Sequence, residues 1–304
     1  MNSINKNFIK RGKYQQKGIN SKSQCLTCER KCIISEGKVG YCGTRLNFRG
    51  EIFTLVYGCI PAQSCNPIEK KPLYRFHPGT TAFTVGTYGC NFDCFWCQNW
   101  NLSHPSPSTL HLIKNCHTYL SPEDLVKKAL EKGCQGTSIS FNEPTLLFEY
   151  SLAVFKIAKQ HGLYNTYVSN GYMTEQVLTD LIDQGLDAIN IDVKGSPEMV
   201  NKYCGADMEK VWRNARILVE KGVHVEITTL LIENLNTDVT SIKTISKCIK
   251  EELGASTPYH LSRSFPRYKS EEYGFIKPTP LNLMHRALLL AKSEGLEWVY
   301  LGNV

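Results

Sequence analysis

The sequence lacks any apolar run long enough to cross a lipid bilayer, and it does not open with a basic segment followed by an apolar secretory core. These two absences argue against an integral membrane protein and against a secreted disulfide scaffold. With 304 residues, 42% of them apolar, the chain can bury one large core beside a smaller segment. We therefore expect a cytoplasmic protein that contacts no membrane.

Acidic residues are scarce at the start of the chain. Residues 1–31 hold eight Lys and Arg against the single acid Glu29, which leaves 27 residues of each charge in the rest of the chain. The net charge of +7 therefore belongs to this opening stretch. A basic, polar opening is typical of a solvated tail, with RNA or an acidic partner as the alternative contact. We predict a flexible basic tail over residues 1–24.

Cysteine is plentiful and unevenly placed. Nine of the 13 cysteines fall between residues 25 and 97, and the other four are scattered singly, as ordinary buried cysteines are. In a chain without a secretory leader, this number predicts metal or cluster chemistry in a reducing compartment rather than disulfide bonds.

The first cysteine group comprises Cys25, Cys28, Cys32 and Cys42. Four thiolates at such spacing predict a closed second metal site inside a cysteine-rich segment, which we place at residues 25–79. Zinc is the commoner occupant of a four-thiolate site, and an auxiliary iron–sulfur cluster is the alternative. The spacing does not separate the two.

The second group, Cys90, Cys94 and Cys97, has the spacing Cys-x3-Cys-x2-Cys and directly follows an apolar run at residues 81–88. Thiolate ligands of iron–sulfur clusters usually come in fours, so three on one loop leave one iron of a 4Fe-4S cluster open for a substrate. Part of a zinc site, or unligated thiols, are the alternatives by spacing alone. The aromatic residues between the cysteines suit a cluster shielded from water.

A regular alternation of strand and helix begins at Thr81 and predicts an α/β fold with six or seven parallel strands. This is too few strands for a complete eightfold barrel, so we predict a partial TIM-like (β/α)6 barrel over residues 80–304. The expected strands span residues 81–88, 137–141, 164–169, 188–193, 223–232, 258–262 and 298–301. The expected helices begin at residue 122 or span residues 148–161, 174–184, 211–221, 237–253 and 282–293.

Polar residues follow the predicted strands, where barrel enzymes carry their chemistry. In chain order they are Asn142, Glu143, Ser169, Asn170, Asp192, Lys194 and His260. Each has an ordinary structural interpretation: a helix start for Asn142 and Glu143, an ion pair for Asp192, a satisfied core histidine for His260. Their convergence on one end of one barrel nevertheless predicts a single site.

Together these motifs resemble the radical S-adenosylmethionine (SAM) superfamily. The core up to about Arg267 resembles the activating enzymes related to the pyruvate formate-lyase activating enzyme. Nearly the whole chain more closely resembles the radical SAM protein of the AmmeMemoRadiSam system. The segments that carry this closer resemblance are the two cysteine groups and residues 66–73, 89–99, 142–145, 169–172, 192–195, 226–230 and 299–303.

The resemblance implies that Cys90, Cys94 and Cys97 ligate a 4Fe-4S cluster whose open iron chelates the amino and carboxylate groups of SAM. The reduced cluster then cleaves SAM to methionine and a 5'-deoxyadenosyl radical. Trp96 is implied to pack near the cluster and the adenine. The residues implied to line the SAM pocket are Asn142, Glu143, Ser169, Asn170, Asp192, Lys194 and His260. Residues 141–143 read Phe-Asn-Glu where the activating enzymes have Gly-Gly-Glu.

We therefore predict a radical SAM oxidoreductase that abstracts hydrogen from a substrate the sequence does not identify, whether protein, RNA or small molecule. Its expected partner is a reductant such as flavodoxin or ferredoxin. One alternative is an activating enzyme for a glycyl radical enzyme, although the extra ferredoxin-like clusters of those enzymes are missing. The other is a non-catalytic iron–sulfur or zinc protein that serves electron transfer or contacts RNA.

Overall fold

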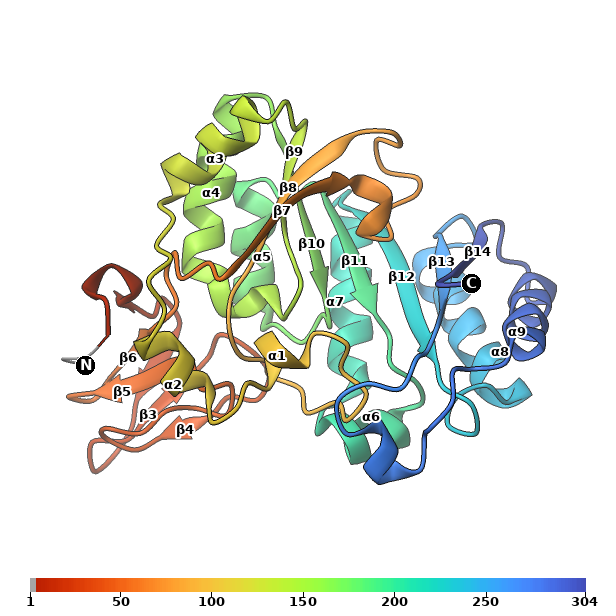
Figure 1. The fold of residues 1–304 in the computed structure, drawn as a ribbon, viewed down its shortest axis with the longest axis horizontal. Helices are drawn as coiled ribbons and strands as arrows, with labels where there is room; N and C mark the ends of the chain where they lie inside the picture. The colour runs from red at the N-terminus through yellow and green to blue at the C-terminus, as the bar shows by residue number, and fades with distance from the viewer. Residues whose placement is uncertain (1–3) are drawn as a thin grey trace.

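A curved sheet with seven parallel strands organises the protein, as seen in a computed structural model that describes residues 4–304 (Figure 1). The parallel strands are β8 (Thr81–Gly86), β9 (Gly136–Ile139), β10 (Tyr164–Ser169), β11 (Ala188–Asp192), β12 (His224–Leu231), β13 (Tyr259–Arg263) and β14 (Val299–Gly302). They lie side by side in chain order. The predicted α/β class and parallel sheet are confirmed, with every strand end within two residues of its expected position.

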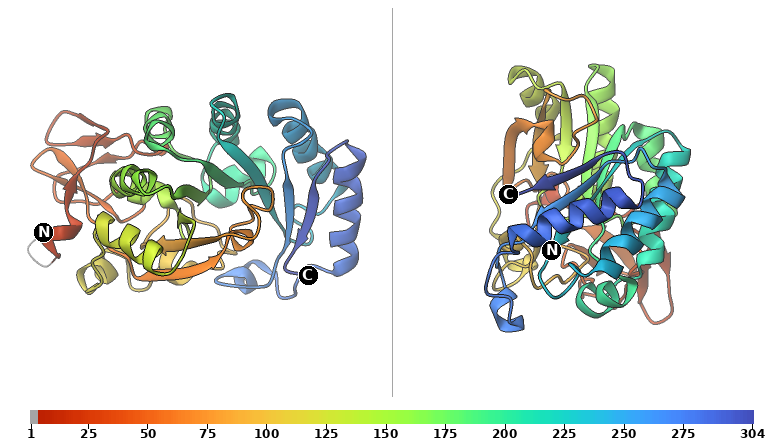
Figure 2. Two further views of the ribbon diagram at one scale, coloured as in Figure 1. Left: turned by 90° about the horizontal axis from the view of Figure 1, so that it is seen from above. Right: turned by 90° about the vertical axis from the view of Figure 1, so that its right-hand side faces the viewer.

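Helices connect these strands and cover the outer face of the sheet (Figure 2). They are α1 (Trp100–Ser103), α2 (Thr109–Lys114), α3 (Pro122–Glu131), α4 (Phe148–Gln160), α5 (Glu175–Gln184), α6 (Pro197–Cys204), α7 (Met208–Glu220), α8 (Val239–Cys248) and α9 (Leu281–Ser293). Helix α3 shows why they form where predicted: the side chain of Ser121 accepts a hydrogen bond from the Asp124 N–H, and proline occupies the first helical position. Its Leu125, Val126 and Ala129 are buried, which fixes the helix on the sheet.

An eighth strand, β7 (Ala62–Pro67), pairs antiparallel with β8 at the edge of the sheet. Ala62–Pro67 alternates between half-buried and exposed residues without an apolar face, and it ends in a proline. Edge strands tolerate proline because one side of their backbone has no partner. The strand therefore forms by pairing with β8, and its own side chains give little signal.

Residues 68–80, which we call the strap, cross the sheet at the amino ends of its strands. The strap begins with the short helix η2 (Ile68–Lys70). Its Tyr74 and Arg75 N–H groups donate to the Glu226 carboxylate on β12 at 3.0 and 2.7 Å. The Pro72 carbonyl accepts a hydrogen bond from Asn190 of β11 at 2.8 Å. These bonds hold the strap across this end of the curved sheet.

The N-terminal part folds into two small antiparallel sheets beside the carboxyl ends of the barrel strands (Figure 1). The first contains β1 (Lys10–Arg11), β6 (Glu51–Thr54) and β5 (Arg45–Phe48), and the second contains β2 (Gln15–Lys17), β3 (Ser23–Cys25) and β4 (Ile33–Ile34). The turn between β5 and β6 has the sequence Asn-Phe-Arg-Gly, and Arg49 and Gly50 adopt positive φ angles there.

The prediction of a flexible tail over residues 1–24 is wrong for residues 4–24. A short helix, η1 (Lys6–Phe8), and the strands β1 and β2 occupy this stretch, and Phe8 is 0% exposed. The physical reason is backbone pairing with β6 and β3, together with burial of Ile4 and Phe8. Residues 1–3 of the predicted tail lie outside the described residues. The domain boundaries at residues 24 and 79 stay predictions.

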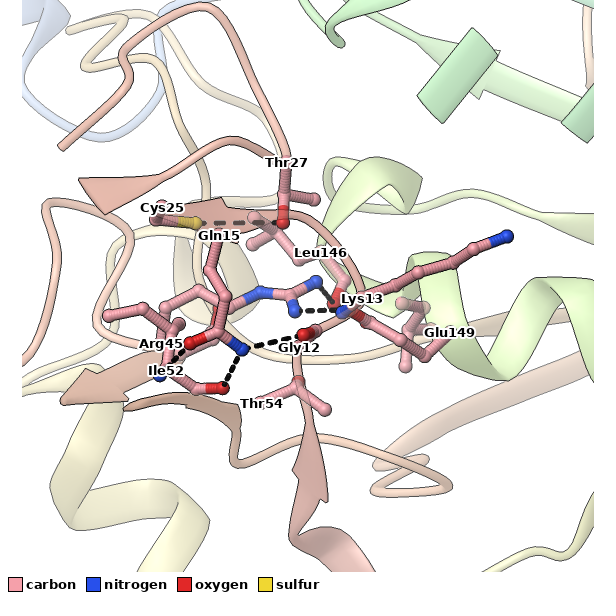
Figure 3. Close-up of polar contacts among 12 residues, drawn as sticks. Gly12, Lys13, Gln15, Cys25, Thr27, Arg45, Ile52, Thr54, Leu146 and Glu149 are labelled. Atoms are coloured by element: carbon pink, nitrogen blue, oxygen red, sulfur yellow. Dashed lines mark hydrogen bonds and ion pairs between the residues drawn. The ribbon is translucent and has the colours of Figure 1, made fainter. Parts of the chain in front are cut away.

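A buried ion pair fastens the hairpin to the barrel (Figure 3). Arg45 Nη1 lies 2.6 Å from Glu149 Oε1 on α4, and Arg45 Nη2 donates to the Leu146 carbonyl at 3.3 Å. The Lys13 N–H donates to the same Glu149 oxygen at 3.2 Å. A buried charge is tolerated when it is paired and hydrogen-bonded, and both conditions are met here. The N-terminal part is therefore fixed on the barrel at the end that carries the cysteine loop.

Candidate functional site

A cavity of about 480 Å³ lies inside the curved sheet. The carboxyl ends of the parallel strands, the loops that follow them and part of the strap form its wall. It extends to both edges of the sheet, since Asn66 of the edge strand β7 and Asn303, which directly follows the edge strand β14, line it. A volume of this size is typical of pockets that enclose a drug-sized ligand. The position is the one at which barrel enzymes place their active sites.

The cysteine loop follows β8 and forms one wall of this cavity. Gly89 has a φ of +89°, and a Cβ there would lie 2.4 Å from the Cys42 carbonyl oxygen, so the position requires glycine. Cys90, Cys94 and Cys97 all line the cavity, and the Cys97 N–H donates to the Cys94 carbonyl at 3.2 Å. The structure thus brings the three predicted cysteines together.

The surroundings of these thiols fit a bound iron–sulfur cluster. Burial raises the pKa of the Cys90 thiol well above its ordinary value, and the charge of Glu143 adds to the effect. Burial also raises the pKa of the Cys97 thiol, and the charge of Cys94 raises it further by a smaller amount. Three neighbouring thiolates repel one another, so these thiols lose their protons together when a cationic group is bound between them. A 4Fe-4S cluster held by three thiolates supplies such a group.

A fourth cysteine lies behind the loop. Cys204, at the end of α6, is fully buried, and its Sγ lies 3.4 Å from Cys94 Sγ. This contact is the largest cause that raises the pKa of Cys94. Among residues 4–304, the cysteines that line the cavity are Cys90, Cys94 and Cys97, and Cys204 is not one of them. The sequence analysis counted Cys204 among the scattered cysteines. No local pattern could link it to Cys94, because the two residues are 110 positions apart.

Trp96 lines the cavity beside the cysteines and is only 2% exposed. Its ring packs against Phe95 with centroids 4.6 Å apart, and Phe95 stacks on Tyr273 at 4.1 Å. Tyr203 of α6 closes the cluster at 6.2 Å from Trp96. These rings form an apolar flank that keeps water from one side of the cysteine loop.

Glu143 lines the cavity and also begins the short helix η3 (Pro144–Leu147). Its Oε1 accepts hydrogen bonds from Ser169 Oγ at 2.8 Å and from the Thr145 N–H at 3.0 Å, and its Oε2 accepts one from the Asn170 N–H at 2.9 Å. Burial raises the pKa of Glu143, and these hydrogen bonds oppose that rise. Both interpretations of this residue therefore hold, as a helix start and as a cavity residue.

Asn142 and Asn170 support the cysteine loop from the neighbouring strand ends. Asn142 Nδ2 donates to the Gly89 carbonyl at 2.8 Å, and Asn142 Oδ1 accepts from the Thr87 N–H at 3.0 Å. Asn170 Nδ2 donates to Asn91 Oδ1 at 2.7 Å. Both asparagines line the cavity, as does Ser169. The side chains of Asn142 and Asn170 therefore hold the cysteine loop in place and also line the cavity.

Asp192, the last residue of β11, and Lys194 just beyond it form an ion pair in the cavity wall. Burial lowers the pKa of Lys194, but the charges of Asp192 and then Cys94 more than reverse this and raise it above the ordinary value. Only Asp192 Oδ2 takes part in the pair, and the buried Oδ1 has no hydrogen-bond partner among the described residues. The pair therefore presents a cation near the cysteines and one free carboxylate oxygen.

His260 does not line the cavity, so its expected place in the SAM pocket is corrected. It is 3% exposed, and its Nε2 lies 2.6 Å from Glu226 Oε2. Its ring packs against Tyr74 of the strap at 4.6 Å. The physical reason is position along the strand: His260 pairs in register with Thr228, and its side chain meets Glu226 deeper in the sheet. His260 is thus a satisfied core histidine.

The cavity residues that the sequence analysis did not single out include Lys71 of the strap, Asn190 of β11 and Thr228 of β12. Lys71 lies in a Lys-Lys-Pro motif that carried part of the family resemblance, but its sequence neighbours do not reveal that it points into a barrel. Asn190 and Thr228 lie inside predicted strands, where alternation could have placed them on the inner face.

Cys25, Cys28, Cys32 and Cys42 line a second, small hollow of about 20 Å³, together with Arg45. Cys25 Sγ donates to Thr27 Oγ1 at 3.5 Å (Figure 3). Within residues 4–304, no three or more His, Cys, Asp or Glu side chains are arranged to hold a single metal ion. The structure brings the four predicted cysteines to one place, and the metal site there stays a prediction.

This second hollow adjoins the cysteine loop. Arg30 lines it, and Arg30 Nη2 donates to the Cys204 carbonyl at 2.8 Å while its Nε donates to the Asn91 carbonyl. The guanidinium also lies over the Tyr41 ring at 3.6 Å. One arginine therefore bridges the N-terminal cysteines and the backbone next to Cys90.

The part of the chain that the structure describes contains no helix long and apolar enough to span a membrane.

Known proteins resemble this chain in sequence and in fold. An uncharacterized protein of Methanocaldococcus jannaschii is 35% identical over 96% of this chain and 84% of its own length. The (2S)-3-sulfopropanediol dehydratase activating enzyme of Klebsiella oxytoca is 25% identical over 60% of this chain and 58% of its own. A radical SAM methyltransferase from Sphaerobacter thermophilus shares the fold, with a TM-score of 0.55 over 74% of this chain and 67% of its own at 14% identity.

The sequence pattern of the Radical SAM superfamily matches residues 84–241, which is just over half of the chain. The matched region begins in β8, includes the cysteine loop, and ends in α8. Members of this superfamily are enzymes that work with a 4Fe-4S cluster and SAM. The chain therefore belongs to the radical SAM superfamily.

Proposed function

We propose that Cys90, Cys94 and Cys97 ligate a 4Fe-4S cluster, and that the enzyme cleaves SAM reductively and abstracts hydrogen from a substrate bound in the same cavity. The observation that carries the proposal is that three cysteines, and not a fourth, face a cavity ringed by polar strand ends. The cluster supplies the electron that splits SAM into methionine and a 5'-deoxyadenosyl radical.

The chain's own residues orient SAM in this proposal. Glu143 accepts hydrogen bonds from the Ser169 hydroxyl and the Asn170 N–H and presents its carboxylate to the SAM amino group. Lys194 offers a cation to the SAM carboxylate, and Asp192 Oδ1 is free to accept a ribose hydroxyl. Trp96 packs beside the adenine and excludes water from the radical.

The test is an anaerobic assay of the reconstituted enzyme with dithionite or reduced flavodoxin. We expect 5'-deoxyadenosine from SAM and a shift of the reduced cluster's electron paramagnetic resonance (EPR) signal when SAM is added. A protein that forms no 5'-deoxyadenosine and shows an EPR signal indifferent to SAM would instead be a non-catalytic iron–sulfur protein. A one-electron donor such as flavodoxin or ferredoxin is the proposed partner.

Membership of the AmmeMemoRadiSam system is part of the proposal. The uncharacterized relative aligns over 96% of the chain, whereas the activating enzyme aligns over 60%. That difference favours a whole-chain family distinct from the activating enzymes. Activation of a glycyl radical enzyme is the second candidate, supported by the dehydratase activating enzyme among the relatives. Its test is the appearance of a glycyl radical EPR doublet on such an enzyme after incubation with SAM and reductant.

We also propose that Cys25, Cys28, Cys32 and Cys42 bind a metal, zinc or an auxiliary iron–sulfur cluster. All four line one hollow beside the positively charged Arg45, whose charge favours thiolates. Metal analysis of the protein separates the two occupants: about one zinc per chain beside about four irons, or a second set of irons. Cys28→Ala is expected to remove only this second component. Unchanged metal content in that variant would refute the site.

A further inference from the structure

The strap places a lysine inside the cavity. Lys71 follows η2, where its N–H donates to the Ile68 carbonyl at 2.8 Å, and it is only 5% exposed. Its side chain lines the same cavity as the three cysteines. Its Nζ lies 5.3 Å from the ring centroid of Phe141, at the end of β9. A cation so deeply buried is costly unless a partner compensates it.

No carboxylate within residues 4–304 forms an ion pair with Lys71. The acids that share the cavity are already engaged: Asp192 pairs with Lys194, and Glu143 accepts hydrogen bonds from three residues. Burial, and then the charge of Lys70, lower the pKa of Lys71 to about 8. The ammonium is therefore still mostly protonated at neutral pH but has no anionic partner among the residues that the structure describes.

Polar atoms without partners also lie in this cavity. Asn190 Nδ2 is bonded to the Pro72 carbonyl, next to Lys71, while the buried Asn190 Oδ1 has no hydrogen-bond partner among the described residues. Thr228 Oγ1 on the adjacent strand β12 is buried and unpartnered in the same sense. Buried polar groups normally have hydrogen-bond partners. Unpartnered polar atoms in the same cavity as an unpaired cation therefore indicate a place for a ligand.

Lys71 and Lys194, two of the three lysines that line the cavity, reach it from different elements. Lys194 follows a strand at its carboxyl end, where the charge of Cys94 acts on it. Lys71 comes from the strap at the amino ends of the strands, and the only charge that acts appreciably on it is that of Lys70. SAM must sit beside the cysteines, so Lys194 is the cation within its reach. Lys71 is left for the second reactant.

We propose that Lys71 binds an oxyanion of the substrate, a carboxylate or a phosphate carried by a small organic molecule, with the Thr228 hydroxyl as a second donor to the oxyanion and Asn190 Oδ1 as an acceptor for a donor group of the same molecule. This inference rests on the proposed function, and it deepens that function by naming the substrate class. A small molecule suits the enclosed position of Lys71, which leaves little room for a polypeptide.

The test uses the reconstituted holoenzyme with SAM bound, and two probes: inorganic phosphate and succinate. Binding of each probe at millimolar concentration is followed by calorimetry for the wild type, Lys71→Met and Lys71→Arg. We expect the wild type to bind at least one probe, Lys71→Met to bind it at least about tenfold more weakly, and Lys71→Arg to recover most of the affinity. Whichever probe binds identifies the oxyanion as phosphate or carboxylate. Lys132→Met, which removes an exposed lysine at the end of α3, is the matched control for net charge.

Three results would overturn the proposal: no binding of either probe to the wild type, equal binding to wild type and Lys71→Met, or an equal loss in Lys132→Met. A tenfold weaker SAM affinity in Lys71→Met with probe binding retained would assign Lys71 to SAM instead. Probe binding is measured without SAM cleavage. Absence of 5'-deoxyadenosine in the wild type would therefore refute the proposed function without deciding the role of Lys71.

Discussion

Cys94 and Cys204 touch through their sulfur atoms, yet only Cys94 faces the cavity. If the cluster has three protein ligands, the two cysteines must respond differently to removal. We predict that Cys94→Ala loses most of its cluster iron and all 5'-deoxyadenosine formation. Cys204→Ala should retain the iron, at a stability cost of about 1 kcal/mol for the small cavity it leaves. Iron content and the EPR response to SAM check both variants.

Cys248→Ala, which changes a half-buried cysteine on α8, controls for cysteine removal in general. If Cys204→Ala loses its iron as fully as Cys94→Ala does, the cluster has four protein ligands. SAM then has no open iron to bind. In that case the electron-transfer alternative gains support, and the proposed catalytic role loses it.

At the level of secondary-structure elements, Glu226 on β12 fastens the strap to the sheet. It is fully buried and accepts hydrogen bonds from the Tyr74 and Arg75 N–H groups, and it lies 2.9 Å from His224 Nε2 and 2.6 Å from His260 Nε2. Burial alone would raise its pKa, but the histidines and the backbone N–H groups lower it to about 2. The ionised carboxylate is therefore the form that the folded protein stabilises.

This lowered pKa predicts a pH-dependent stability. A depressed carboxyl pKa contributes stability above the unfolded value near 4.5, and the contribution is lost as the pH falls towards 2. At pH 7 we expect Glu226→Gln to lower the free energy of unfolding by about 3 kcal/mol. The difference from the wild type should shrink below about pH 4.5, as urea unfolding of the apoprotein at several pH values would show. Glu131→Gln, at an exposed site, is the control, and a difference as large at pH 3 as at pH 7 would contradict the role of Glu226.

The sequence predicted those elements whose own residue pattern indicates their secondary structure. Seven strands were located because apolar runs alternate with amphipathic helices, and Asn142 to Lys194 were found because they follow those strands. Strand β7 and the ordered residues 4–24 were missed because pairing with distant strands, not their own composition, forms them. For a similar reason, the sequence analysis assigned His260 to the cavity and did not assign Lys71 to it. Which of them reaches the cavity depends on depth along a strand and on where the strap crosses.

In the whole molecule, the N-terminal part is joined to the barrel next to the cysteine loop. Arg30 of the N-terminal part donates to two backbone carbonyls of the barrel, those of Asn91 and Cys204. Cys42, a member of the N-terminal group, packs its carbonyl against Gly89, immediately before Cys90. The two cysteine groups therefore share one interface, and a change that forces it apart should reach both.

Gly89→Ala is the sharpest test of this shared interface. The new Cβ would lie 2.4 Å from the Cys42 carbonyl oxygen, a distance that backbone must move to relieve, and the φ of +89° adds strain of about 1 kcal/mol. Gly37→Ala is the matched control, since Gly37 has a φ of +72° and no atom within 4 Å of its Cβ position. Both variants suffer the same kind of backbone strain, and only Gly89→Ala meets an obstacle. We therefore expect metal loss from both cysteine groups in Gly89→Ala and full metal content in Gly37→Ala, measured by elemental analysis and EPR. Equal metal content in the two variants would mean that the barrel and the N-terminal part hold their sites independently.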